Sequence, residues 1–312
     1  MKFWTPLACA VVISSTTVAA HGKITRTVEK TFAVQPGGQV HAETQGGNIT
    51  VKTDDANEVR IVVTQVIDAS SEEAANKALE KLSLSLEQKG NDVSAIATYQ
   101  KRMGGGWGNW PPVQVSYTIT VPRVFNLQLN TSGGDIKVGS VKGSVNARTS
   151  GGDLLFERID GELDGKTSGG NVTLNEGTAR ANLSTSGGNI RIDRAGGPTT
   201  VSTSGGDIRI QSAAQLLSAH TSGGSVSAKL TEAPRQDMTL RTSGGNVTVT
   251  VPRTAAFNLE AHTSGGEVGM ENLTLSNLVT NKRKTNVSAT VNAGGPKLSL
   301  HTSGGDIRVK GE

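Results

Sequence analysis

The chain has 312 residues, a formal net charge of +4, 39 glycines and only 3% aromatic residues. So few aromatic rings argue against a compact globular core, which usually gains much of its buried area from them. The charged residues are interspersed, so the small positive charge favours solubility and does not predict nucleic-acid binding. The apolar residues are mainly Val, Ile, Leu and Ala beside Thr, a composition typical of β-strands.

Residues 1–20 have the pattern of a secretory signal peptide. Lys2 precedes an apolar run over residues 3–18, and residues 18–20 form a Val-Ala-Ala cleavage site. The run is too short for a good membrane span, and no later segment is apolar for long enough. Cys9, the only cysteine, lies inside this leader and before most of the run, which disfavours a lipoprotein signal and excludes disulfides from the mature chain. The prediction is an exported protein, periplasmic or extracellular at the cell surface, with no transmembrane segment after cleavage.

Residues 21–120 are predicted to form an N-terminal cap region. The segment from Ser70 to Glu73 matches a capping box and starts a helical pattern near residues 71–82. Alternating apolar residues predict strands at 59–67, 82–86, 93–99 and 113–121. An irregular α+β segment of this kind would cover the exposed sheet edge at one end of a repeat array.

Residues 121–312 carry an internal repeat. The sequence Thr-Ser-Gly-Gly (TSGG) begins every 18 residues from Thr131 to Thr221, and again at Thr242, Thr263 and Thr302. A polar residue follows each TSGG, and apolar and polar residues then alternate, which predicts a strand with one buried face. Two short strands per coil cannot bury that face alone, so the coils must stack. The predicted fold is all-β, a parallel β-solenoid of 18–21-residue coils.

The repeat and the stacking of its coils in chain order lead to further expectations. The glycines of TSGG would supply backbone with positive φ in the turn. The 21-residue intervals would hold expanded turns, and the 39-residue interval after Thr263 would hold two coils, with residues 281–284 looped out. The last coil, ending at residue 310, would leave the C-terminal end of the stack either poorly protected or in contact with a partner. The Val-Pro-Arg segments at 121–123 and 251–253, each followed by Phe-Asn-Leu, would begin similar coils.

Three sequence features together resemble the bacterial "putative adhesin" family, domain of unknown function 4097. These are the leader, the TSGG repeat followed by a polar and an aliphatic residue, and the Val-Pro-Arg…Phe-Asn-Leu segments. The resemblance covers the chain from Val34 to its end. It implies a β-solenoid envelope or secreted protein, with no established enzymatic activity and no catalytic residues to carry over. Some relatives look tied to envelope-stress systems.

The acidic residues after the glycines are the first candidate site. Asp135 and Asp153 would stack one rung apart, at about the 5 Å separation of the carboxylates in a retaining glycosidase, and stacked carboxylates also suit Ca²⁺. Asn171, Asn189 and Ser225 occupy the same position in other coils. Because Asp and Asn interchange there, capping of the turn by a side-chain oxygen is the favoured interpretation. The sequence predicts no catalytic residue, cofactor or metal site.

Histidines and tryptophans supply two more candidates. His220, His262 and His301 each precede a TSGG, but chain order separates them by at least two rungs, too far for a shared zinc ion. Trp107 and Trp110 lie in a glycine-rich segment, where tryptophan can stack on a sugar, enter a membrane interface or fold back over the cap. Packing over the cap is the favoured interpretation of Trp107 and Trp110.

A column of basic residues is the remaining candidate for ligand binding. Lys137, Arg191, Arg209 and Arg308 occupy the same outward position in their coils. Such a column suits a polyanion such as lipopolysaccharide or teichoic acid. It is also typical of a solvated sheet face whose charges deter aggregation, and this is the favoured interpretation.

Three functions remain open on the sequence alone. The preferred one is a non-enzymatic, exported cell-envelope protein, an adhesin-like binder or scaffold for a glycan, a surface or another envelope protein. A β-helix carbohydrate-active enzyme is an alternative, although it needs a groove with converging carboxylates that the sequence does not indicate. An envelope-stress sensor or regulator that binds a protein partner is the third.

Overall fold

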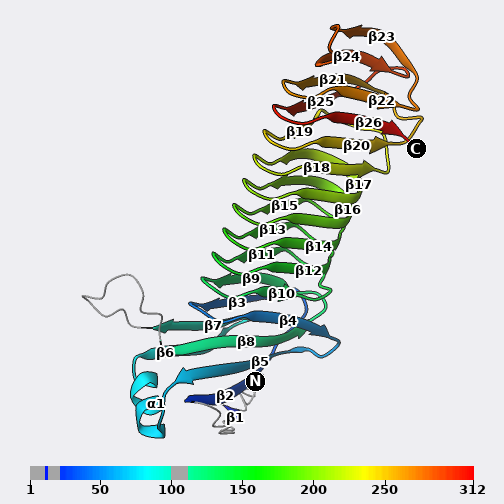
Figure 1. Cartoon of the computed structure of the whole chain (residues 1–312). Helices are drawn as coiled ribbons and strands as arrows, with labels where there is room; N and C mark the ends of the chain where they lie inside the picture. The colour runs from blue at the N-terminus through cyan, green and yellow to red at the C-terminus, as the bar shows by residue number, and fades with distance from the viewer. Residues whose placement is uncertain (1–10, 13–21, 100–111) are drawn as a thin grey trace, which may run out of the picture. The chain divides into compact units, whose positions relative to one another are not determined.

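The computed structural model describes residues 11–12, 22–99 and 112–312. They form two compact units, residues 1–152 and residues 153–312. The described part of the chain contains one helix, and nearly all its other regular structure is β-strand (Figure 1). The all-β prediction is therefore confirmed.

The first unit contains α1 and strands β1 to β11. Their bounds are β1 (Val11–Val12), β2 (Lys23–Ala33), β3 (Gln39–Thr44), β4 (Ile49–Asp54), β5 (Glu58–Asp68), α1 (Glu72–Leu79), β6 (Leu82–Lys89), β7 (Asp92–Tyr99), β8 (Val113–Pro122), β9 (Asn126–Thr131), β10 (Ile136–Val138) and β11 (Val145–Arg148). The four strands expected in the cap region are all present. The helix begins one residue later than the capping-box pattern suggests, because the side chain of Ser71 accepts the main-chain N–H of Ala74.

Antiparallel strands give way to parallel ones within the first unit. Strands β2, β5 and β8 pair in antiparallel fashion, and β8, β4 and β10 then pair in parallel. On the other face β6 and β7 are antiparallel, and β7, β3, β9 and β11 are parallel. Tyr117 of β8 is buried between these layers, and its hydroxyl donates to the main-chain oxygen of Glu43 (3.1 Å). Burial raises the pKa of this phenol, so it stays a neutral donor.

The second unit contains strands β12 to β26. Their bounds are β12 (Leu154–Ile159), β13 (Leu163–Lys166), β14 (Val172–Gly177), β15 (Ala181–Ser184), β16 (Ile190–Ser202), β17 (Ile208–His220), β18 (Val226–Leu230), β19 (Met238–Arg241), β20 (Val247–Val251), β21 (Phe257–Thr263), β22 (Val268–Glu271), β23 (Leu275–Thr280), β24 (Asn286–Val291), β25 (Lys297–Thr302) and β26 (Ile307–Gly311).

Equivalent residues of successive coils pair in parallel register in the second unit. Leu154 lies beside Val172, Val172 beside Ile190, and Ile190 beside Ile208. Each of these side chains is at most 1% exposed, while the residues that follow them in sequence face outward. The core is therefore made of aliphatic columns running through the stack, as the period-2 pattern predicts.

The threonine of each TSGG ties neighbouring coils together. Thr242 is fully buried, and its hydroxyl donates to the carbonyl of Gly224 in the preceding coil (2.6 Å). The same oxygen accepts the N–H of Gly245 in its own turn (3.3 Å). A buried hydroxyl is stable only when paired in this way, which explains why a polar residue recurs at an inward position.

The second glycine of each TSGG is required by a close approach between coils. A Cβ atom on Gly188 would lie 2.0 Å from the carbonyl oxygen of Gly170, and one on Gly206 would lie 2.1 Å from that of Gly188. None of the TSGG glycines has the positive φ expected from the sequence, so that explanation is wrong. Glycine is present because a side chain would collide with the main chain of the coil next to it.

The coils at the C-terminal end do not stack in chain order. Strands β25 and β26, which form the last coil of the sequence, pair on one side with β19 and β20. On the other side they pair with β21 and β22. The last coil is thus inserted between the two that precede it, as the strand order in the second unit shows (Figure 1). The expectations of a bare C-terminal coil and of an expanded turn between Thr242 and Thr263 are both wrong.

An antiparallel hairpin covers the coil of β21 and β22. Strand β24 pairs in antiparallel fashion with β21, and β23 pairs with β24. The 39-residue interval after Thr263 therefore holds this hairpin and not two parallel coils, while residues 281–284 form its turn.

The first unit also contains a coil that is inserted between two coils that follow it in sequence. The coil of β3 and β4 lies between β7–β8 on one side and β9–β10 on the other. The chain therefore passes over a whole coil between β8 and β9, and again between β20 and β21. Val121-Pro122-Arg123 and Val251-Pro252-Arg253 lie where these two passages begin, at the ends of β8 and β20. Proline lacks a donor N–H, so it suits a residue where the chain leaves a strand ladder.

Candidate binding surfaces

Two of the outward arginines lie directly beside each other. Arg191 of β16 is in register with Arg209 of β17, between Thr173 on one side and Ser227 on the other. Arg191 forms an ion pair with Asp193 (2.8 Å), whereas no carboxylate of the described residues lies within 4 Å of the Arg209 guanidinium.

The other two members of the basic column are not next to this pair. Lys137 lies in the first unit, in register with Thr50. Arg308 is beside Thr248 and Gly269 and pairs with Asp306 (3.2 Å). Among the four residues of the basic column, therefore, only Arg191 and Arg209 lie beside each other.

The polar residues after the glycines form ladders of main-chain caps. The Oδ1 atom of Asp153 accepts the N–H of Asn171 (2.6 Å), and Oδ1 of Asn171 accepts that of Asn189 (2.9 Å). In the first unit Oδ1 of Asn48 accepts the N–H of Asp135 (2.8 Å). Asp and Asn supply the same oxygen, so these contacts fit the structural interpretation over a catalytic one. The bond runs to the next coil, however, and not within the turn itself.

Two histidines that chain order would separate are stacked. His301 of β25 lies in register with His262 of β21, with ring centroids 5.3 Å apart and planes inclined by 16°. Arg241 lies on the other side of His301. Burial lowers the pKa of His301, and the nearby charges of Arg241 and His262 lower it further. The predicted separation was wrong because the inserted coil brings these residues together.

Replacing His301 by glutamine is expected to weaken the pH dependence of stability. The folded protein holds the pKa of His301 below its unfolded value of about 6.5, so the unfolded chain binds the proton more readily. Stability is then lost as the pH falls through about 6.5 toward the lower folded value. The fall in melting temperature between pH 7.5 and 5.0 should be smaller in His301→Gln. A control change, His220→Gln, should leave most of that fall intact; equal effects of both changes would refute the role of the stacked pair.

The described residues contain no group of three or more His, Cys, Asp or Glu side chains placed to hold a metal ion. Within the same ranges, no helix is long and apolar enough to cross a membrane.

An open groove follows the Ser-Gly-Gly turns of the first unit. It is lined by Gly46, Val113, Gln114, Ser132, Gly133, Ser150 and Gly151. The glycines among these residues have no side chain to fill the groove. The side chain of Gln114 donates to the carbonyl of Gly46 (3.1 Å). No ionisable side chain is among these lining residues, so the groove suits an uncharged ligand better than acid–base chemistry.

Trp107 and Trp110 lie outside the described residues. In sequence they fall between β7 and β8. The main-chain N–H of Tyr99, at the end of β7, donates to the side chain of Gln45 (3.2 Å). Val113, at the start of β8, lines the groove. Their role in ligand binding stays a prediction.

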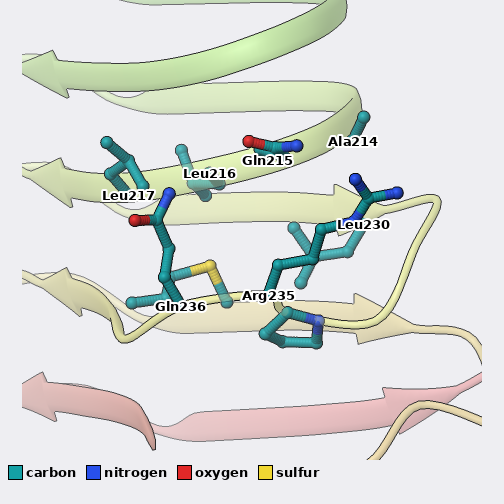
Figure 2. Close-up of a pocket in the computed structure, with 9 residues that line it drawn as sticks. Ala214, Gln215, Leu216, Leu217, Leu230, Arg235 and Gln236 are labelled. Atoms are coloured by element: carbon teal, nitrogen blue, oxygen red, sulfur yellow. The ribbon is translucent and has the colours of Figure 1, made fainter. Parts of the chain in front are cut away.

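A small crevice lies under the turn between β18 and β19. Figure 2 shows Arg235 and Gln236 of this turn facing Gln215, Leu216 and Leu217 of β17, with Leu230 beside them. The only ionisable side chain that lines it, Arg235, forms an ion pair with Glu232 (2.7 Å). The crevice therefore reflects a longer turn passing over an irregular strand, and it contains no pair of groups for acid–base catalysis.

Stacked parallel coils with TSGG turns define a repeat protein of the Toastrack class. Residues 32–310 match the Toastrack family, DUF4097, and the chain belongs to that family. The resemblance inferred from the repeat is therefore confirmed.

The solved structures found by comparison share little sequence with this chain. A "putative adhesin" from Bacteroides fragilis is 12% identical, with 91% of this chain and 97% of that one covered and a TM-score of 0.41. A "putative lipid binding protein" from Parabacteroides distasonis is 14% identical, with 92% and 96% covered and a TM-score of 0.46. A "putative adhesin" from Parabacteroides merdae is 10% identical, with 91% and 95% covered and a TM-score of 0.38. No curated protein sequence matches the chain.

Proposed function

We propose that this protein is an exported, non-enzymatic component of the cell envelope that binds an extended anionic glycan through the outward face of its second unit. The observation that carries the proposal is the in-register pair of Arg191 and Arg209, one of them without an acidic partner among the described residues. Guanidinium groups one strand apart, about 4.8 Å, match closely spaced phosphate or carboxylate groups, which arginine binds with two parallel hydrogen bonds. The predicted leader over residues 1–20 supports export.

The surroundings of the pair favour a repetitive partner over a small one. Thr173 and Ser227 flank the arginines on the same outward column, so hydroxyl groups extend the polar strip in both directions. The strip runs across neighbouring strands of one sheet. Such a row of cations and hydroxyls contacts a polymer along its length, whereas a small ligand needs a concave site.

A binding array of envelope polymers tests this function. The chain should bind phosphate- or carboxylate-bearing polymers such as lipopolysaccharide or teichoic acid, and Arg191→Gln/Arg209→Gln should lower the affinity about a hundredfold or more, since charge-assisted contacts contribute roughly 1.5–3 kcal/mol each. A Trp107→Ala/Trp110→Ala variant separates the two candidate sites. Loss of binding in the tryptophan variant alone would move the site to the connection between β7 and β8. Binding to no polymer would overturn the proposal and favour a protein partner, as in an envelope-stress sensor.

A further inference from the structure

The hairpin of β23 and β24 combines exposed aliphatic side chains with unpaired cations. Three large apolar residues of the described chain are markedly exposed, and two of them, Leu278 (49%) and Val279 (68%), are neighbours on β23. The turn that follows carries Lys282, Arg283 and Lys284, all exposed. No carboxylate of the described residues lies within 4 Å of these three cations.

The sequence around the hairpin contains no acidic residue. From residue 272 to residue 296 there is no Asp or Glu, so this segment carries a net charge of +3. Glu271, just before it, is paired with Lys310 (3.4 Å). The positive charge of the turn is therefore not neutralised locally, in contrast to the ion pairs that accompany Arg191 and Arg308 elsewhere in this unit.

Hydrogen bonds hold the backbone of the basic turn in place, and they do not use the side chains of its three cations. The side chain of Asn281 accepts the N–H of Thr285 (2.9 Å) and donates to its hydroxyl (2.7 Å). The carbonyl oxygens of Lys284 and Thr285 accept the N–H groups of Val268 and Thr263 (2.9 and 2.8 Å). These bonds anchor the turn on the TSGG that begins at Thr263, so binding through its cations would cost little backbone entropy.

The exposed edge of β23 is unsuited to pairing with a further strand. Its register against β24 shifts between Ser276 and Val279, and Asn277 lies in the left-handed region with φ of 52°. Bulges of this kind twist an edge away from regular hydrogen bonding. Contact at this end must therefore use side chains, and the side chains offered are aliphatic and cationic.

Aliphatic residues beside unpaired cations are the combination that an anionic bilayer surface accepts. Apolar side chains enter the boundary between headgroups and acyl chains, and Lys and Arg remain at the charged headgroups. We propose that the β23–β24 hairpin docks the protein on membranes that contain anionic lipids. This inference rests on the hairpin alone and does not depend on the glycan site.

Flotation with lipid vesicles tests the docking. The full chain, processed as the expression host processes it, would be mixed with vesicles of phosphatidylcholine alone or with 30% phosphatidylglycerol added. Binding should require phosphatidylglycerol. It should also weaken in 0.5 M salt, where the screening length shrinks to about 4 Å.

Removing the three cations is the decisive change. In Lys282→Gln/Arg283→Gln/Lys284→Asn, asparagine is chosen because Lys284 has φ of 52°, which asparagine tolerates. Each cation near an anionic surface is worth about 1 kcal/mol, or roughly fivefold. The triple change should therefore weaken binding on the order of a hundredfold. Leu278→Ser/Val279→Ser should also weaken it, and it tests the apolar contribution without altering the charge.

A charge-matched control decides whether the hairpin itself is the site. Lys137→Gln/Arg191→Gln/Arg209→Gln also removes three cations, but from the outward column. It should reduce vesicle binding by only a few fold. Equal losses in both triple variants would overturn the proposal in favour of diffuse electrostatic attraction, as would binding that is insensitive to phosphatidylglycerol. Loss of glycan binding with vesicle binding retained in this control would show that the two surfaces act separately.

Discussion

Gly188→Ala is expected to lower the melting temperature of the second unit by roughly 6 to 12 °C or more. The added Cβ would lie 2.0 Å from the carbonyl oxygen of Gly170 and 2.5 Å from its carbonyl carbon. These are main-chain atoms held by pairing on both sides, so the coils must separate locally. Overpacking of this kind costs about 3 kcal/mol, and 1 kcal/mol corresponds to about 2–4 °C for a unit of this size. Thermal unfolding followed by circular dichroism measures the shift.

The adjacent glycine supplies the matched control. A Cβ on Gly187 would lie 3.5 Å from the nearest main-chain oxygen, an ordinary van der Waals contact. Gly187→Ala should therefore change stability by less than about 1 kcal/mol. Because neither residue has a positive φ, a general intolerance of the turn to alanine would affect both variants equally. That result would contradict the close-approach explanation.

Local pattern was sufficient to predict the strands and the inward columns. Side chains alternate along each strand with period 2, so the buried position of Ile190 and the outward position of Arg191 follow from their sequence alone. The regular 18-residue spacing also places Arg191 beside Arg209. These features depend only on residues within one coil and its immediate repeat.

The order in which the coils stack does not follow from the pattern within a single coil. Every coil presents nearly the same columns, so the coil after Thr302 fits against the coil after Thr242 as well as against its neighbour in sequence. For this reason the spacing misplaced His262 and His301 by one coil. The sequence signal for the coil order lies in the two similar Val-Pro-Arg segments, which by pattern alone predict only the start of a coil. The structure shows that both occur where the chain skips a coil.

The basic hairpin was missed for a related reason. The repeat spacing predicts that residues 281–284 loop out between two parallel coils, which gives their charge no particular role. The absence of Asp and Glu between residues 272 and 296 is visible in the sequence. Its meaning depends on knowing that β23 is an edge strand with exposed Leu278 and Val279, which only the pairing reveals.

Removing residues 297–312 is expected to prevent the C-terminal part of the second unit from folding. The truncation deletes β25 and β26 from inside the stack, together with the buried side chains of Leu298, Leu300, Ile307 and Val309. Burying each such side chain contributes about 1.5–3 kcal/mol, so the loss is roughly 6 to 12 kcal/mol. A loss of that size equals the total stability of a typical domain. Soluble yield and limited proteolysis would report it; an unchanged melting curve would show that the last coil is peripheral.

A disulfide test identifies the neighbours of the inserted coil without destabilising it. Ser299 of β25 lies in register with Thr239 of β19 on one side and with Glu260 of β21 on the other. Strand neighbours are about 4.8 Å apart, within the range that a disulfide spans. Thr239→Cys/Ser299→Cys should therefore form a disulfide on mild oxidation. Thr239→Cys/Glu260→Cys should not, because the inserted coil holds these residues two strands apart. Coils stacked in chain order would give the reverse result, since β19 and β21 would then be neighbours.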